Sequence, residues 1–218
     1  MRIALLGPPG SGKGTQAARI CQTFSLPYLS SGDILRAERD SDSARGRKIK
    51  EFMNSGLLVP DELTLELIRD KVSALQGGFL LDGFPRTLPQ AEALNKLLFD
   101  LRRPLELVLN FSVAPSLLAK RFEGRRLCSN AKCAATYHVE SLKPKKDGVC
   151  DKCGSPLIIR ADDKPEVVKQ RIETYEKQTA PLIKFYGELG NFKTIDAAGS
   201  IDDVTKTVLA KIRRHFEE

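Results

Sequence analysis

The sequence contains no tryptophan and only two histidines, and aromatic residues make up 6% of its 218 positions. So few aromatic side chains argue against a surface on which single-stranded bases stack. No apolar run approaches the roughly 18 residues that a membrane-spanning helix needs, and the first residues lack the charged and hydrophobic regions of a secretory signal. We therefore expect a cytoplasmic protein that binds neither nucleic acid nor a membrane.

Charged residues are plentiful, with 35 lysines and arginines against 28 aspartates and glutamates, which gives a net charge of +7. The basic residues form no long run, so phosphorylated small molecules explain the surplus better than nucleic acid or an acidic membrane. Hydrophobic residues make up 41% of the chain, which is enough for a sizeable core. The length suits one α/β domain that carries insertions.

A glycine-rich segment lies close to the amino terminus. Residues 2–6 form an apolar run of strand length, residues 7–15 read GPPGSGKGT, and the following residues favour a helix. This order is typical of a phosphate-binding loop, whose backbone N–H groups and helix dipole attract phosphate. Lys13 would contact the outer phosphates, and Thr15 would contact phosphate or Mg²⁺. Because Gly14 follows the lysine, the hydroxyl comes one position later than in the strict pattern. The segment predicts binding of a nucleotide polyphosphate.

Apolar runs of strand length alternate with helix-like segments along the rest of the chain, which predicts a parallel sheet flanked by helices. Four further strands are expected at residues 26–30, 78–82, 105–111 and 192–196. Helices are expected at residues 34–39, 46–54, 61–75, 88–101 and 115–123, in a long segment from 162 that Pro181 kinks or ends, and in a last segment with Val204, Val208, Ile212 and Phe216 on its buried side. The predicted fold class is α/β with five parallel strands, and residues 30–59 form a small helical insertion.

Four of the five cysteines lie in one segment, as the pairs Cys128-x4-Cys133 and Cys150-x2-Cys153. Two close pairs of thiols are typical of a tetrahedral structural zinc site, and in a reducing compartment a metal is favoured over disulfides. The simpler interpretation is four reduced cysteines in a small lobe. A zinc ribbon also raises the hypothesis of a nucleic-acid-binding module that a nucleotide switches. Salt-dependent binding of single strands would favour that module, whereas turnover with nucleotides alone would dismiss it.

Four segments resemble the adenylate kinase family, in its long bacterial type with a zinc-binding lid: residues 7–16, 30–36, 81–86 and 160–163. The resemblance covers nearly the whole chain in colinear order. It implies a P-loop nucleoside monophosphate kinase fold with a core at 1–29, 60–126 and 161–218, an AMP-binding insertion at 30–59, and a zinc-ribbon-like lid at 127–160. It also implies a monomer that carries out the Mg²⁺-dependent reaction ATP + AMP ⇌ 2 ADP, which serves adenine nucleotide homeostasis.

The resemblance assigns roles to individual residues. On the ATP side it implies contacts from Gly10, Ser11, Gly12, Lys13, Gly14, Thr15, Arg121, Arg125, Thr136, Tyr137 and Gly199. On the AMP side it implies contacts from Ser31, Arg36, Leu57, Leu58, Val59, Gly83, Phe84, Pro85, Arg86, Gln90, Arg160 and Arg171. Around the transferred phosphoryl group it implies Lys13, Arg86, Arg125, Arg160, Arg171, Asp162 and Asp163. Asp82 would hold the water shell of Mg²⁺, and Cys128, Cys133, Cys150 and Cys153 would hold Zn²⁺.

Two alternatives stay open at this stage. The runner-up activity is that of a UMP/CMP kinase, against which the long cysteine-bearing lid and the hydroxyl of Ser31 both weigh. Asp162 and Asp163 have a simpler interpretation as a helix cap, because Asp163 and Glu166 have the spacing of a capping box.

Overall fold

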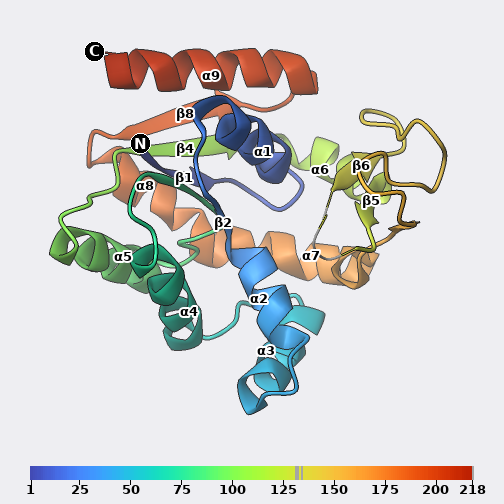
Figure 1. Ribbon diagram of the computed structural model, residues 1–218, viewed down its shortest axis with the longest axis horizontal. Coiled ribbons are helices and arrows are strands. Elements are labelled where there is room, and N and C mark those ends of the chain that lie inside the picture. The colour runs from blue at the N-terminus through green and yellow to red at the C-terminus, as the bar shows by residue number, and fades with distance from the viewer. Residues whose placement is uncertain (131–132, 134, 218) are drawn as a thin grey trace.

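The computed structural model describes residues 1–130, 133 and 135–217 and has a central parallel sheet covered by helices on both faces (Figure 1). The five strands lie in the order β2-β3-β1-β4-β8, and every pair is parallel. Their bounds are β1 (Arg2–Leu6), β2 (Tyr28–Ser30), β3 (Phe79–Asp82), β4 (Leu107–Ser112) and β8 (Phe192–Asp196). The strands are short continuous apolar runs because a parallel sheet of this kind is buried on both faces.

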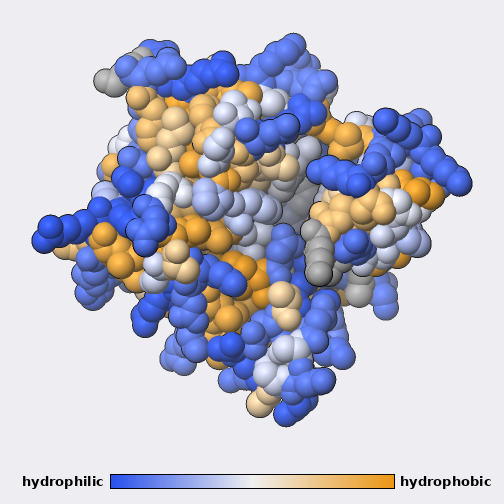
Figure 2. Space-filling view, viewed as in Figure 1, coloured by the Kyte–Doolittle hydropathy of each residue, from blue (hydrophilic) through white to orange (hydrophobic). Residues whose placement is uncertain are grey.

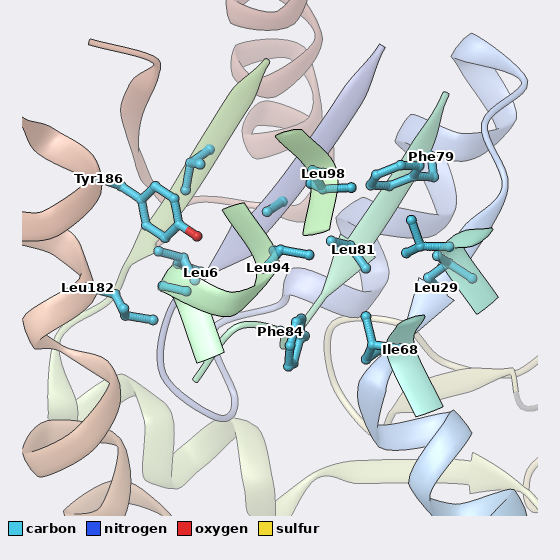
Figure 3. Packing of buried hydrophobic residues seen from close by; sticks show 14 residues of the cluster. Leu6, Leu29, Ile68, Phe79, Leu81, Phe84, Leu94, Leu98, Leu182 and Tyr186 are labelled. Carbon is cyan, nitrogen blue, oxygen red and sulfur yellow. The ribbon is translucent and has the colours of Figure 1, made fainter. Parts of the chain in front are cut away.

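The helices divide into two layers and an insertion. Their bounds are α1 (Lys13–Phe24), α2 (Ser31–Arg39), α3 (Ala44–Asn54), α4 (Asp61–Ser73), α5 (Leu88–Asp100), α6 (Pro115–Glu123), α7 (Pro165–Thr174), α8 (Pro181–Gly187) and α9 (Ile201–Glu217). One face of the sheet packs on α1 and α9 through Ile20, Val204, Val208 and Ile212. The other face packs on α4, α5 and α8, with the side chains drawn in Figure 3.

Helices α2 and α3 project from the sheet as a small lobe with its own apolar cluster of Leu35 and Ile49, against Val59 and Leu67 (Figure 1). The turn between the two helices is tight. A Cβ atom at Gly46 would lie 2.5 Å from the carbonyl oxygen of Glu38, so only glycine fits there. The lobe lies within residues 30–59, where the sequence predicts a small helical insertion.

The cysteine segment forms a second lobe, at the right in Figure 1, and its core is a small antiparallel sheet in the order β6-β5-β7. The strands are β5 (Arg125–Cys128), β6 (Thr136–His138) and β7 (Leu157–Ile158). The buried cluster of this lobe holds Cys128, Ala135, Tyr137 and Cys150. Since the lobe has little other core, a ligand held by the cysteines would add to its stability. We call this lobe the lid.

The predicted elements are confirmed with bounds that shift by a few residues, and the strand expected at 26–30 covers only Tyr28–Ser30. The predicted capping box is wrong: α7 begins after Lys164 and has no side-chain cap, and a 3₁₀ turn at Ala161–Asp163 comes before it. The long helical segment is interrupted: α7 ends at Thr174, a π-helical turn covers Tyr175–Thr179, and Pro181 is the first residue of α8 and does not end the segment. No helix in the described part of the chain combines enough length and apolar character to span a bilayer.

Candidate active site

One cleft of about 1040 Å³ runs between the lid, the α2–α3 lobe and the carboxyl ends of the sheet strands. Figure 2 shows the surface hollowed between the lid and the rest of the molecule. A parallel sheet binds its ligands at this edge. All of the residues expected to contact nucleotide line this cleft except Phe84 and Asp163. The cleft therefore brings together groups that are far apart in the sequence.

The glycine-rich loop joins β1 to α1 at the floor of the cleft. Gly10 and Gly12 have φ angles of +81° and +90°, which side chains other than hydrogen rarely permit. A Cβ atom on Gly10 would also lie 2.9 Å from the Phe122 ring. Helix α1 begins at Lys13, so the backbone N–H groups of its first turn are directed at the cleft. This is the geometry of an anion-binding loop.

The Lys13 ammonium group is held by the loop itself. It donates to the carbonyl oxygens of Gly7 and Pro8 at 2.6 and 2.9 Å and lies 3.3 Å from the Ser11 hydroxyl. Desolvation lowers the pKa of Lys13 from 10.5 to about 8, the nearby Asp82 opposes the shift, and neighbouring arginines add to it. The free protein therefore disfavours the charged form of the lysine that a phosphate would require.

Three arginines of the cleft also have lowered pKa values. Burial lowers the pKa values of Arg86, Arg160 and Arg171, those of the last two to about 10, and repulsion from other arginines contributes to each shift. The Arg160 Nε atom is buried and has no hydrogen-bond partner among the described residues. Crowded cations with low pKa values indicate a site that is complete only when an anion lies between them.

Asp82 lies at the carboxyl end of β3, beside the start of α1. A Cβ atom on Gly14 would be 3.6 Å from Asp82 Oδ2, so the carboxylate is next to the phosphate-binding loop. The Tyr28 hydroxyl donates to the same oxygen at 2.8 Å, and this contact raises the pKa of Tyr28 together with burial, the larger cause. A carboxylate oxygen beside a phosphate site suits Mg²⁺, which binds hard oxygen donors and keeps much of its water.

The opposite end of the cleft is lined by the α2–α3 lobe and the loop after β3. The Ser31 hydroxyl donates to the Gly83 carbonyl at 2.6 Å, and Arg36 forms an ion pair with Asp33. Arg86 donates through Nε to the same Gly83 carbonyl at 2.6 Å. Arg86 and the Ser31 hydroxyl therefore share one hydrogen-bond network at the Gly83 carbonyl.

The Gln90 side chain, in α5, fixes the loop after β3 through two hydrogen bonds. Its amide oxygen accepts the backbone N–H of Arg86 at 2.7 Å, and its amide nitrogen donates to Asp61 at 2.6 Å. Phe84 points away from the cleft into the core, as Figure 3 shows, and is fully buried. Its neighbours Gly83, Pro85 and Arg86 line the cleft together with Leu57, Leu58 and Val59.

A third group of residues, expected to contact ATP, lies at the glycine-rich end of the cleft. Arg121 donates to the carbonyl oxygens of Ser11 and Ala197 at 3.1 and 2.6 Å, so its guanidinium plane is fixed above the loop. Gly199 and the β6 residues Thr136 and Tyr137 line the same end. The Tyr137 hydroxyl, however, is directed at the cysteines, at 3.6 Å from Cys150 Sγ.

Asp162 and Asp163 lie where the lid returns to the core, and neither caps α7. Asp163 forms ion pairs with Arg125 and Arg171, and its side chain is 1% exposed. Asp162 pairs with Arg171 at 3.1 Å. Both arginines also lie over the Phe122 ring, at 4.7 and 5.6 Å from its centre. The aspartates therefore hold the arginines that line the cleft, through contacts that the sequence interpretation as a cap did not foresee.

The four lid cysteines come together with all ligand atoms within 4.8 Å of one another. Sγ atoms of Cys128 and Cys153 are 3.3 Å apart, and those of Cys133 and Cys150 are 3.7 Å apart. Disulfide bonds of about 2.05 Å are thus excluded. Four sulfurs at about 2.3 Å from a tetrahedral ion would be about 3.8 Å apart, so the cluster fits zinc. The spacing of the first pair, Cys128-x4-Cys133, is longer than that of the second, and the four thiols still come together.

The sequence interpretation missed two contributors to the site. Tyr28 reaches Asp82 only because β2 pairs with β3, with Ser30 opposite Asp82. Asp61, the first residue of α4, accepts hydrogen bonds from Thr87 and Gln90. Both contacts join residues from separate elements, and no local pattern signals them.

The comparisons with known proteins agree with this geometry. The family model described as adenylate kinase matches residues 5–191. The chain is 47% identical over 211 residues to the adenylate kinase of Ruminiclostridium cellulolyticum, covering 96% of this chain and 98% of the relative. It is 48% identical over 211 residues to the adenylate kinase of Caldicellulosiruptor bescii, covering 96% of this chain and 97% of the relative. With matches of this length and identity, the chain belongs to the adenylate kinase family.

Proposed function

We propose that the protein transfers the terminal phosphoryl group of ATP to AMP, reversibly, and so forms two molecules of ADP. The observation that carries the proposal is the single cleft in which Lys13, Arg86, Arg125, Arg160 and Arg171 meet between a phosphate-binding loop and the α2–α3 lobe. Relatives that carry the name adenylate kinase at 47–48% identity support the same activity. Its role would be adenine nucleotide homeostasis.

The chemistry makes few demands on the side chains. The acceptor is a phosphate monoester with a second pKa of about 6, so its attacking oxygen is largely ionised at neutral pH and needs no general base. The protein must align the two nucleotides and place positive charge around the phosphoryl group. The buried cations of the cleft meet this need, and their mutual repulsion is relieved when a polyphosphate lies between them.

The cleft has two ends with different recognition chemistry, and we assign ATP to the end with the glycine-rich loop. Gly10 to Thr15 would bind its phosphates, and Arg121, Thr136 and Gly199 would surround its base. AMP would bind at the end lined by Ser31, Arg36, Gln90, the loop 57–59 and the loop 83–86, with Phe84 contributing through its backbone alone.

Two metal ions belong to the proposal. Mg²⁺ bound with ATP would neutralise phosphate charge, and Asp82 would hold its water shell. Structural Zn²⁺ would be held by Cys128, Cys133, Cys150 and Cys153 and would stabilise the lid. The lid at 127–160 and the insertion at 30–59 would close over the nucleotides, because water competes with AMP as acceptor.

The test is an assay of ADP formation from ATP and Mg²⁺ with AMP, UMP or CMP as acceptor. We expect AMP to be preferred strongly, and a compound of two adenosines joined through five phosphates to bind in competition with both substrates. Lys13→Met should lower turnover by at least about 100-fold while the protein stays folded. Lys96→Met is the matched control, since this lysine is exposed and pairs with Asp100 in the same helix.

Each alternative gives a different result. Preference for a pyrimidine acceptor would assign the protein to the UMP/CMP type. Absence of ADP with every acceptor, in protein that binds ATP, would refute phosphoryl transfer and favour the nucleotide-switched binding module.

A further inference from the structure

Tyr137 occupies the middle of β6, and most of its side chain belongs to the buried cluster of the lid. It is 6% exposed and packs with Cys128, Ala135 and Cys150. Part of the residue borders the cleft, as do Thr136 and His138. Side chains alternate along a strand, so the two neighbours of Tyr137 face away from the cluster. β6 therefore has the cysteine cluster on one side and the nucleotide cleft on the other.

The Tyr137 hydroxyl makes two polar contacts. Its oxygen accepts the backbone N–H of Asp151 at 2.8 Å and lies 3.6 Å from Cys150 Sγ. A backbone N–H can only donate, so the tyrosine oxygen is the acceptor in the first contact. A thiolate that binds a metal ion has no hydrogen to donate, so in the metal-bound site the hydroxyl would donate its one hydrogen to the Cys150 sulfur. Hydrogen bonds to an ionised acceptor are shorter and stronger than neutral ones.

Both partners of the hydroxyl, Cys150 and Asp151, lie in the Cys150-x2-Cys153 pair of the metal site. Asp151 directly follows Cys150, and the turn continues through the backbone N–H of Gly154, which donates to the Cys150 carbonyl at 2.8 Å. Tyr137 thus holds the backbone after Cys150 as well as its sulfur. Cys150 itself is 2% exposed, so bulk water does not replace the tyrosine as a donor.

We propose that Tyr137 is a positioning residue of the lid metal site, whose hydroxyl fixes the Cys150 sulfur for the ion and ties it to the strand that borders the cleft. The inference rests on the zinc site proposed above. It differs from the expectation that the Tyr137 side chain serves ATP. Hydrogen-bond partners of metal ligands typically change metal affinity by 10–100-fold, which sets the size of the expected effect.

The test removes one oxygen atom. In Tyr137→Phe we expect zinc affinity, measured by competition with a chromophoric chelator, to fall by about tenfold. In the Co²⁺-substituted protein we expect the thiolate-to-metal charge-transfer band to move, because one thiolate loses its hydrogen bond. Tyr186→Phe is the matched control: Tyr186 is fully buried in the core against the sheet, and this change should alter neither quantity.

A second control separates positioning from packing. Leu157 packs against the same cluster without a polar contact to sulfur, so Leu157→Ala should lower the stability of the lid and leave the band in place. A band that does not move in Tyr137→Phe overturns the proposal whatever the affinity, since the tyrosine would then only fill space. If the wild-type protein binds neither Zn²⁺ nor Co²⁺, the metal site itself is refuted, and the role of Tyr137 with it.

Discussion

Binding of ATP should be accompanied by uptake of a proton at Lys13. In the free protein, desolvation lowers the pKa of this lysine from 10.5 to about 8, and the arginines around it add to the shift. The phosphates of a bound nucleotide would surround the ammonium group with negative charge and restore its ordinary pKa. Around pH 8 the neutral lysine of the free protein must therefore take a proton from the solvent when the nucleotide binds.

The size of the effect follows from the pKa alone. With a value of about 8 in the free protein, the neutral fraction of Lys13 is about 0.1 at pH 7 and about 0.5 at pH 8. ATP is almost fully ionised at pH 8, so the nucleotide itself contributes little to the proton uptake.

The same pKa difference makes the stability of the folded protein depend on pH. The unfolded chain binds more protons between pH 8 and 10.5, so stability should rise with pH across that range, by at most about 3 kcal/mol.

Isothermal titration calorimetry in buffers with different enthalpies of ionisation measures the uptake directly. We expect about 0.5 proton per ATP at pH 8 and about 0.9 at pH 9, where ATP is fully ionised, from the titration of a single lysine. Lys13→Met should bind ATP more weakly and take up no proton at either pH. Uptake that stays constant between the two pH values, or that persists in Lys13→Met, would refute the assignment of this titration to Lys13.

Three further predictions concern stability. Asp163→Asn removes the buried carboxylate that pairs with Arg125 and Arg171 and should cost about 2 kcal/mol or more in urea denaturation, whereas Asp147→Asn at an exposed position should leave the midpoint unchanged. Tyr186→Phe should stabilise the protein by about 1 kcal/mol, because the Tyr186 hydroxyl is buried without a partner among the described residues; a loss of stability would reveal a hidden partner. Removal of the lid metal by a strong chelator should lower the melting temperature of the wild type and not that of Cys150→Ser, and equal shifts would contradict the metal site.

The parts of the fold that the sequence predicted well are those with local causes. The strand Phe192–Asp196 and the helix Pro115–Glu123 have the expected bounds, because a buried parallel strand is a continuous apolar run and a proline favours the first turn of a helix. The phosphate-binding loop was also predictable, since its glycines, lysine and flanking elements follow one another directly. The four cysteines meet as their spacing suggested.

The failures involve side chains whose partners lie far away in the chain. Asp163 has the spacing of a capping residue, but its carboxylate binds Arg125, 38 positions earlier, because a buried guanidinium competes better for it than a backbone N–H. Tyr28 meets Asp82 across 54 positions. Tyr137 borders the cleft, but no local pattern indicated that its hydroxyl contacts Cys150. Sequence patterns report periodicity and local turns, whereas these contacts depend on the packing of separate elements.

The aspartates at the lid boundary and the low pKa of Lys13 both reflect the crowding of cations in the cleft, although burial is the larger cause of the Lys13 shift. Several cations are crowded into one cleft, and the free protein tolerates them in two ways: Arg125 and Arg171 are neutralised by Asp162 and Asp163, while Lys13 is partly deprotonated around pH 8. A polyphosphate competes with the aspartates for the same guanidinium groups. Because Arg125 begins the first lid strand and Arg171 lies in the helix after the lid, any change in their pairing acts at both connections of the lid to the core. We therefore expect nucleotide binding and lid position to be coupled through these ion pairs, and Asp163→Asn to change ATP affinity as well as stability.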